Sequence, residues 1–139
     1  MIPINNNIQK MMKVYKINEG ISFSFPSNWL VEHDNNLISV FDPQNGVGAL
    51  QFSIYEIKDT NSINLVEKLS DYLEEKHGAV SVKLFIDYSY SDLTDEDGVY
   101  WRYWLFSKKN RIIFVSYNCA QEDIGQEDTE IMQIIKSLN

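Results

Sequence analysis

The sequence has little of what disulfides, metal sites and nucleic-acid interfaces require. Its only cysteine is Cys119 and it has two histidines, so neither an internal disulfide nor a zinc site of soft ligands is expected. Its 12 lysines and arginines are outnumbered by 20 aspartates and glutamates, and the formal charge is −8. Phosphates and anionic lipid surfaces are bound by clustered cations, whereas the basic cluster at 108–111 is better explained as a turn between strands. We therefore expect no nucleic-acid partner and no membrane partner.

No apolar run in the sequence is long enough for a signal-peptide core or a membrane span. Together with the single cysteine, this predicts a cytoplasmic protein in a reducing compartment. What is present is a foldable composition, because 139 residues, 44% of them apolar, suffice to bury one core without disulfides or metal. Residues 14–139 are expected to form a single domain. Residues 1–13 are either a flexible lead or the result of a misassigned start.

The most distinctive local pattern is at 20–29, Gly-Ile-Ser-Phe-Ser-Phe-Pro-Ser-Asn-Trp. Its three apolar residues alternate with two serines, which is typical of a half-buried strand, and Pro26 removes a ladder donor and ends the strand. We expect a partner strand just before it and a meander of short strands after it. These strands are predicted at 14–17, 29–32, 37–41 and 49–57.

Two amphipathic helices are predicted. The first has apolar residues at helical spacing over 65–73, with Asn64 as its N-cap and Gly78 at its C-terminal end. Its solvent side is assigned Glu67, Lys68, Asp71, Glu74, Glu75 and Lys76. The second helix closes the domain, with an apolar stripe and two solvated acids in its first turn. The stripe is Ile124, Ile131, Ile134, Ile135 and Leu138, and the acids are Glu127 and Asp128.

Three long strands are predicted between the helices, at 82–91, 99–107 and 111–119, and their short connections make them antiparallel neighbours. In the middle strand, bulky odd-numbered residues such as Trp101 alternate with bulky even-numbered residues such as Trp104. A strand with large side chains on both faces is expected at the centre of a sheet with a layer on each side. The predicted fold class is therefore α+β, an antiparallel β-sheet packed with amphipathic helices.

The order of these elements resembles that of the PsbP-like superfamily, whose members open with an apolar strand followed by proline and tryptophan, as at 20–29. The resemblance continues in Trp-Arg-Tyr-Trp at 101–104, in the hairpin at 108–111 and in the closing helix. The superfamily includes photosystem extrinsic PsbP proteins, a nuclear-import factor that binds a small GTPase, bacterial DcrB-like proteins and chaperones for effectors of a bacterial secretion system. The resemblance implies a bacterial branch of this fold and a binding role, and it carries over no catalytic residue.

No constellation in the sequence predicts catalysis or a metal site. The acidic run at 92–98 lacks the spacing of an EF-hand, because Trp104 would occupy the position of the bidentate glutamate. Cys119 is expected to be a buried structural cysteine, and His33 and His77 are expected to have structural or surface roles. The sequence has no Gly-rich phosphate loop, GxSxG or HExxH motif. We therefore expect a protein that is not an enzyme and needs no cofactor.

The remaining functional candidates are aromatics and acids on neighbouring strands, because tyrosine and tryptophan anchor protein interfaces and acids steer association. The candidate partner-binding residues are Asp92, Asp95, Glu96, Asp97, Tyr88, Tyr90, Tyr100 and Trp104. We expect a protein partner, and a basic one would suit the charge. Three alternatives stay open: an immunity protein or effector chaperone of a secretion system, a small-molecule-binding protein or enzyme with a pocket between sheet and helix, and a homo-oligomer.

Overall fold

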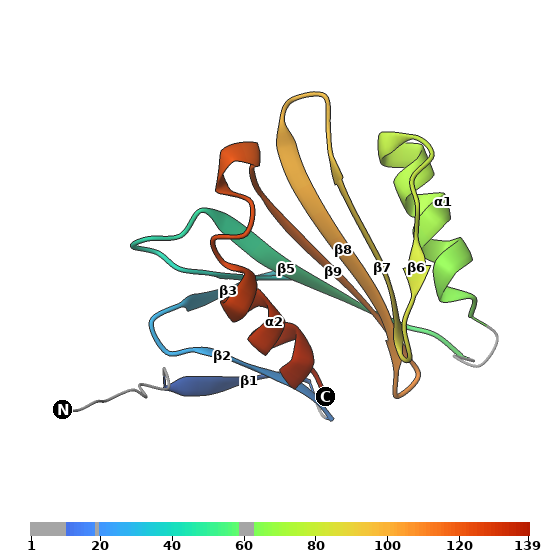
Figure 1. The fold of residues 1–139 in the computed structure, drawn as a ribbon. Helices are drawn as coiled ribbons and strands as arrows, with labels where there is room; N and C mark the ends of the chain where they lie inside the picture. Colours follow the sequence, from blue (N-terminus) through green and yellow to red (C-terminus); the bar gives the residue numbers. More distant parts are fainter. Residues whose placement is uncertain (1–10, 19, 59–62) are drawn as a thin grey trace.

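The computed structural model describes residues 11–18, 20–58 and 63–139. It contains a seven-stranded antiparallel sheet in the order β3-β4-β5-β9-β8-β7-β6 and a separate two-stranded ribbon, β1-β2. The ribbon and helix α2 lie on one face of the large sheet, and helix α1 lies on the other (Figure 1). This arrangement confirms the predicted α+β fold.

The elements follow the predicted order. The strands are β1 (Met12–Asn18), β2 (Ile21–Pro26), β3 (Leu30–Asp34), β4 (Leu37–Phe41), β5 (Gly48–Glu56), β6 (Lys83–Leu84), β7 (Tyr88–Thr94), β8 (Val99–Lys108) and β9 (Arg111–Ala120). The helices are α1 (Leu65–His77), the short 3-10 helix η2 (Gln121–Asp123) and α2 (Asp128–Ser137). The predicted N-terminal lead falls mostly on residues 1–10, which lie outside the described residues, whereas Met12 and Lys13 belong to β1.

The larger core lies between the sheet and the layer formed by α2 and the β1-β2 ribbon. Ile21, Phe23 and Phe25 of β2 are buried at every second position, as the alternation in the sequence predicts. Phe23 stacks on Phe52 of β5, with ring centroids 4.6 Å apart and planes inclined by 4°. Trp104 of β8, a strand paired on both sides, belongs to the same core. These contacts fix the ribbon against one face of the sheet and leave the opposite face to α1.

Helix α1 has the ends that the sequence predicts. The Asn64 side chain accepts a hydrogen bond from the Glu67 N–H at 3.0 Å, and Gly78 follows the helix with a φ of 89°. Leu69 and Leu73 are buried in a second, smaller core against β8 and β9. On this second face of the sheet, α1 packs mainly over β6, β7 and β8.

The strand predicted at 82–91 is interrupted by a tight turn between β6 and β7. The Phe85 N–H donates to the Tyr88 carbonyl at 2.8 Å, and the two rings stack with centroids 4.9 Å apart. Leu84 and Ile86 on either side are exposed, and Ile86 is fully so. The prediction of one continuous strand was wrong because local contacts close the turn within a run of residues with high strand propensity.

The closing helix starts later than the apolar stripe predicts. Ile124 lies before the helix and is 46% exposed, whereas Ile131 and Ile134 are buried in the larger core. Gly125, with a φ of 92°, takes a conformation that cannot continue a right-handed helix, so the regular turns begin only at Asp128. No helix within 11–18, 20–58 and 63–139 is long and apolar enough to cross a membrane.

Glu127, predicted to be a solvated acid, is 7% exposed and joins three segments. Its carboxyl accepts a hydrogen bond from the Tyr117 hydroxyl at 2.7 Å and lies beside the backbone of Val47 and Gly48. Burial raises the pKa of the Glu127 carboxyl, and these polar neighbours oppose the shift. The prediction was wrong because β5 begins with a glycine, whose missing side chain leaves room for the Tyr117 hydroxyl.

We expect the Glu127 carboxyl to contribute less to the free energy of unfolding as the pH rises. A raised pKa means that the folded protein keeps this proton over a pH range in which the unfolded chain has lost it. The contribution of the group is therefore most favourable below its ordinary pKa of 4.5 and is lost as the pH rises through the folded-state pKa. Urea denaturation between pH 4 and pH 8 would measure the free energy of unfolding of the wild type and of Glu127→Gln. As the pH rises, the stability of the variant relative to the wild type should increase. A difference that does not change with pH would contradict this expectation.

Candidate functional site

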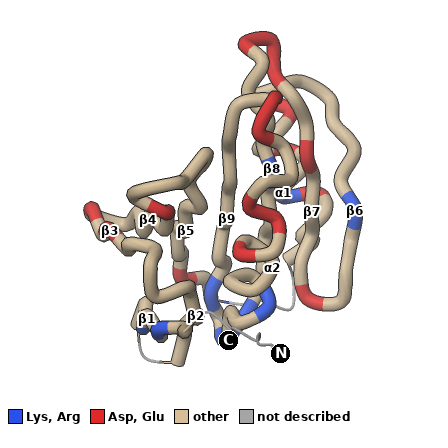
Figure 2. Tube along the Cα trace, turned by 60° about the vertical axis from the view of Figure 1, so that its left-hand side comes forward, with Lys and Arg blue, Asp and Glu red and all other residues tan. Residues whose placement is uncertain are grey.

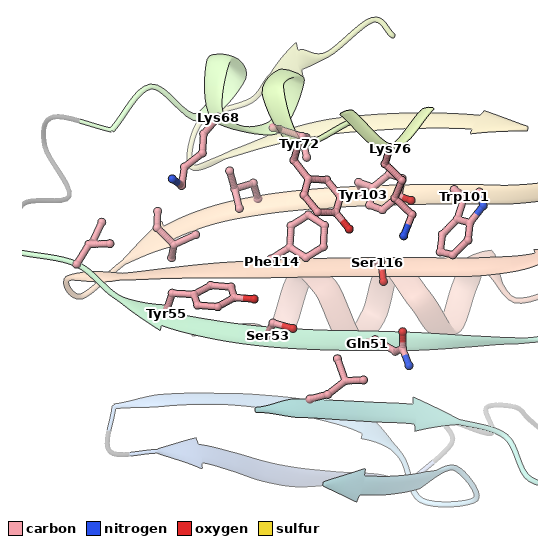
Figure 3. A pocket seen from close by; sticks show the side chains of 15 residues that line it. Gln51, Ser53, Tyr55, Lys68, Tyr72, Lys76, Trp101, Tyr103, Phe114 and Ser116 are labelled. Atoms are coloured by element: carbon pink, nitrogen blue, oxygen red, sulfur yellow. The ribbon is translucent and has the colours of Figure 1, made fainter. Parts of the chain in front are cut away.

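An open groove lies on the face of the large sheet that α1 only partly covers. Its volume is about 540 Å³. The strands β5, β8 and β9 form its floor and α1 forms one wall (Figure 3). We call it the α1 groove, and its main lining residues are Gln51, Ser53, Tyr55, Lys68, Tyr72, Lys76, Trp101, Tyr103, Phe114 and Ser116.

The strand register places polar groups beside aromatic rings on the groove floor. Gln51 of β5 pairs with Ser116 of β9, which in turn pairs with Tyr103 of β8. Two residues further along, Ser53 of β5 pairs with Phe114 of β9. The floor therefore offers hydroxyl and amide groups for polar atoms next to apolar surface for side chains, a combination found in ligand and protein interfaces.

Four of the five aromatic rings that line the groove form one continuous cluster, and the fifth, Tyr55, lies at its rim. Tyr72 of α1 meets Phe114 edge-on, with ring centroids 4.7 Å apart. Tyr103 lies beside Phe114 and stacks on Trp101 at 5.7 Å. Tyr103 is 1% exposed, whereas Tyr55 and Tyr72 are 52% and 42% exposed. The cluster thus has a buried base and an exposed rim, and exposed aromatics of this kind are preferred interface anchors.

Two lysines border the groove along α1. Lys68, Tyr72 and Lys76 recur at every fourth position, so they lie on one side of the helix, the side that faces the groove (Figure 3). The Lys76 Nζ lies 5.1 Å from the Trp101 ring centroid and 6.0 Å from that of Tyr72. Both lysines are exposed, as predicted for the solvent side of α1, and they also border the part of the sheet that α1 leaves open.

His77, at the end of α1, is hydrogen bonded to the floor of the groove. Its Nε2 lies 2.8 Å from the Tyr103 hydroxyl. The helix dipole favours a cation at this position, yet burial, followed by the positive charge of Lys76, lowers the pKa of His77. Burial also raises the pKa of Tyr103. Both groups therefore remain neutral near pH 7, and their hydrogen bond positions the ring of Tyr103.

The aromatic residues predicted to bind a partner lie on the other face of the sheet. Trp104 is 1% exposed and cannot touch a partner, while Tyr88, Tyr90 and Tyr100 are partly buried against the larger core. Arg102 joins this group, because its Nε donates to the Tyr90 hydroxyl at 2.8 Å and its guanidinium lies 4.8 Å from the Trp104 ring centroid. The structure brings these residues together as packing for the sheet.

The predicted acidic residues form the β7–β8 turn and its approach, where acids gather at one end of the molecule (Figure 2). The Asp95 carboxylate accepts hydrogen bonds from the Asp97 and Val99 N–H groups and from the Trp101 indole, at 2.9 to 3.0 Å. The Trp101 hydrogen bond, followed by that from Val99, lowers the pKa of Asp95. Asp95 thus organises the turn, while Glu96 and Asp97 are exposed at its tip. A role of this turn in partner binding stays a prediction.

Asp92, the remaining acidic candidate, is exposed on β7 and shares its carboxylate with the tyrosines beside it. It accepts from the Tyr90 hydroxyl at 2.9 Å and lies 3.4 Å from the Tyr100 hydroxyl. The carboxylate therefore holds two rings that pack against the larger core. Of the eight candidate residues, Asp95 reaches the α1 groove, because its carboxylate accepts a hydrogen bond from the indole of the groove residue Trp101.

In the part of the chain that the structure describes, the groove contains neither a group of metal ligands nor a cysteine. Within the described residues, no three of His, Cys, Asp and Glu are grouped to hold a metal ion. Cys119 is 4% exposed on the face opposite the groove, as the sequence predicts for a structural cysteine, and burial raises the pKa of its thiol. The polar groups that line the groove are hydroxyls, an amide and two ammonium groups.

The sequence left open a pocket between sheet and helix, but none of the candidate binding residues chosen from it lines the α1 groove. Lys68, Tyr72 and Lys76 share one side of a predicted helix, and Trp101 and Phe114 occupy one face of two predicted strands. Nothing in the sequence says that α1 covers only part of that face. The position of α1 over β6 to β8 is a tertiary feature, and it creates the groove.

The comparisons with known proteins concern the fold. No protein-family model and no curated protein sequence matches the chain. The cyanobacterial PsbP of Synechocystis sp. PCC 6803 superposes with a TM-score of 0.66 at 10% identity, covering 99% of this chain and 98% of that one. A mutant of the protein Mog1 gives 0.58 at 9% identity, covering 93% and 95%.

A protein of Bacteroides thetaiotaomicron VPI-5482 is also similar in structure, with a TM-score of 0.61 at 17% identity. The match covers 91% of this chain and 47% of the Bacteroides chain, so this chain spans about half of its length. The likenesses show a PsbP-like fold, as the sequence resemblance implied, and at these identities they show the fold alone.

Proposed function

We propose that this chain of PsbP-like fold is a non-catalytic binding domain that holds an extended segment of a protein partner in the α1 groove. The observation that carries the proposal is the row of half-exposed aromatic rings over a floor of hydroxyl and amide groups. Rings such as Tyr55 and Tyr72 lose water when a partner covers them, which stabilises the complex. Ser53 and the amide oxygen of Gln51, whose nitrogen donates to Ser39, can hydrogen bond to the backbone of the bound segment.

The chemistry of the groove supports binding better than catalysis. General acid–base work needs a titratable group aimed at a substrate with a pKa near the working pH. The lining residues within the described part of the chain include no carboxylate and no thiol, and the neighbouring His77 already hydrogen bonds Tyr103. Structurally similar proteins include PsbP and Mog1, and a shared fold alone assigns no activity.

A small molecule is the second candidate, because the groove volume of about 540 Å³ lies within the range of ligand pockets. Such pockets usually bury most of the ligand surface. Here the rim residues Tyr55 and Tyr72 are about half exposed, so the groove is not enclosed. An extended chain segment that crosses the groove suits this shape better.

We expect groove aromatics, and not exposed aromatics elsewhere, to determine peptide binding. Peptides selected on the wild type from a displayed random library should bind Tyr55→Ser/Tyr72→Ser at least about tenfold more weakly, because each ring contributes about 1 kcal/mol or more as an anchor. Phe85→Ser is the matched control, since Phe85 is 45% exposed at the β6–β7 turn, outside the groove. Dissociation constants from isothermal titration calorimetry would measure the difference.

The proposal fails if the library yields no peptide above background, or if Phe85→Ser weakens binding while the groove double variant does not. Both tyrosines are exposed at the rim, so the double variant should keep its fold, and the far-ultraviolet circular dichroism spectrum would check this.

A further inference from the structure

We propose that the α1 groove selects acidic amphipathic segments, in which two carboxylates and an apolar side chain between them occupy every second position of an extended chain. This inference rests on the proposed function, and it names the chemistry of the partner. The net charge of −8 suggests a basic partner, but at contact a ligand meets the local charge of its binding site, and here the inferred partner is acidic.

The first argument is the charge of the groove itself. Among the described residues, its lining includes Lys68 and Lys76 and no aspartate or glutamate, in a chain where acids outnumber bases by 20 to 12. The Lys76 ammonium lies above the aromatic rings of the groove, at 5.1 Å from the Trp101 centroid. A basic segment would meet like charges here, whereas a carboxylate would form ion pairs beside apolar surface.

The nearby acids are placed outside the groove or are already engaged. The Asp95 carboxylate next to Trp101 accepts three hydrogen bonds from its own turn. Glu32 and Asp34 share the groove face by strand alternation, but they are on the edge strand β3, beyond β4, and do not line the groove. The acids of α1, Glu67, Asp71, Glu74 and Glu75, do not line it either.

The second argument is spacing. Lys68 and Lys76 are eight residues apart on α1, which is about 12 Å along the helix axis, and Tyr72 lies midway between them. In an extended segment, side chains on one face recur about every 7 Å, so residues four apart are separated by about 13 Å. A carboxylate, an apolar side chain and a second carboxylate at alternate positions therefore match Lys68, Tyr72 and Lys76. Figure 3 shows this helix stripe running along the strands of the floor.

The test uses three capped peptides and the isotope-labelled protein. The probe is acetyl-Ser-Glu-Leu-Phe-Leu-Glu-Ser-amide, and its two counterparts carry lysine or glutamine in place of both glutamates. Amide chemical shifts of the protein give the site and the dissociation constant. The indole N–H of Trp101 reports directly on the groove, because Trp29 and Trp104 are 3% and 1% exposed in the core.

We expect the glutamate peptide to bind in the groove about tenfold more tightly than the lysine peptide, since two screened ion pairs contribute up to about 1 kcal/mol each. The Lys68→Glu/Lys76→Glu variant should reverse the order. The Lys13→Glu/Lys16→Glu variant on β1 changes the net charge equally and should keep the wild-type order, because both lysines lie outside the groove. Raising the salt concentration from 50 to 500 mM should weaken the glutamate peptide severalfold and leave the glutamine peptide nearly unchanged.

The possible failures separate the two proposals. If the lysine or glutamine peptide shifts the groove amides with an affinity equal to that of the glutamate peptide, the groove binds peptides without selecting acids, and only the present inference falls. The same holds if the β1 variant changes the order as strongly as the α1 variant does. If none of the three peptides shifts the groove amides at millimolar concentration, both the inference and the proposed function fall.

Discussion

Replacing Trp104 by alanine should lower the free energy of unfolding by about 3–5 kcal/mol, and the loss should appear as destabilisation before any effect on binding. Trp104 is 1% exposed in the larger core, with the Tyr90 ring centroid at 5.4 Å and the Arg102 guanidinium at 4.8 Å. Alanine would leave a cavity at the centre of the sheet, and it would remove the ring over which a charged side chain is held. Urea denaturation followed by far-ultraviolet circular dichroism would measure the loss.

Trp101→Ala is the matched control, because Trp101 is only three residues away on the same strand but on the opposite face. It is partly exposed in the α1 groove, so its loss should cost only about 1–2 kcal/mol and should weaken ligand binding directly. Equal destabilisation by the two variants would contradict the assignment of one tryptophan to the core and the other to the groove.

The second large effect is expected from Gly48→Ala, with a loss of at least about 3 kcal/mol. A Cβ on Gly48 would lie 2.3 Å from the Asn118 carbonyl oxygen and 2.6 Å from the Tyr117 hydroxyl oxygen. The first atom belongs to the neighbouring strand β9, so it can move only if the strand pairing changes. The second moves only by breaking the hydrogen bond of Tyr117 to the buried Glu127 carboxyl. Thermal or urea unfolding of the two proteins would measure the loss.

Gly78→Ala separates this close approach from the general cost of replacing a glycine. Gly78 has a φ of 89°, which strains an alanine by about 1–2 kcal/mol, but a Cβ there would meet nothing within 4 Å. If Gly48→Ala were no more destabilising than Gly78→Ala, the packing of Tyr117 against the backbone of Gly48 would be refuted as the reason.

Particular elements show how far the sequence reaches. The alternation of Ile21, Phe23 and Phe25 predicts a half-buried strand, and β2 buries all three. The Asn64 cap and the terminal Gly78 predict the ends of α1. These patterns succeed because hydrophobic periodicity and helix capping depend on residues that are near one another in the chain.

The predicted binding residues show where such reasoning stops. Tyr90 and Trp104 are candidates because they are aromatics on neighbouring strands, but Trp104 lies in the larger core and Tyr90 packs partly buried against it. Trp101 and Phe114, on the other face, line the groove. Alternation along a strand separates the two faces, yet it does not say which face the next layer covers completely.

By itself, the sequence determined the fold class, the order of the elements, the ends of α1 and the alternation of each strand, because each of these follows from local spacing. Tertiary structure alone decided that α1 packs mainly over β6 to β8, leaving β9 partly covered and β5 uncovered, and that Glu127 is buried above Gly48. The physical reason is that coverage of a sheet face and burial of a charge depend on contacts between segments far apart in the chain. These include the approach of Glu127 to the start of β5 and the packing of α1 beside the pair Tyr103 and Phe114.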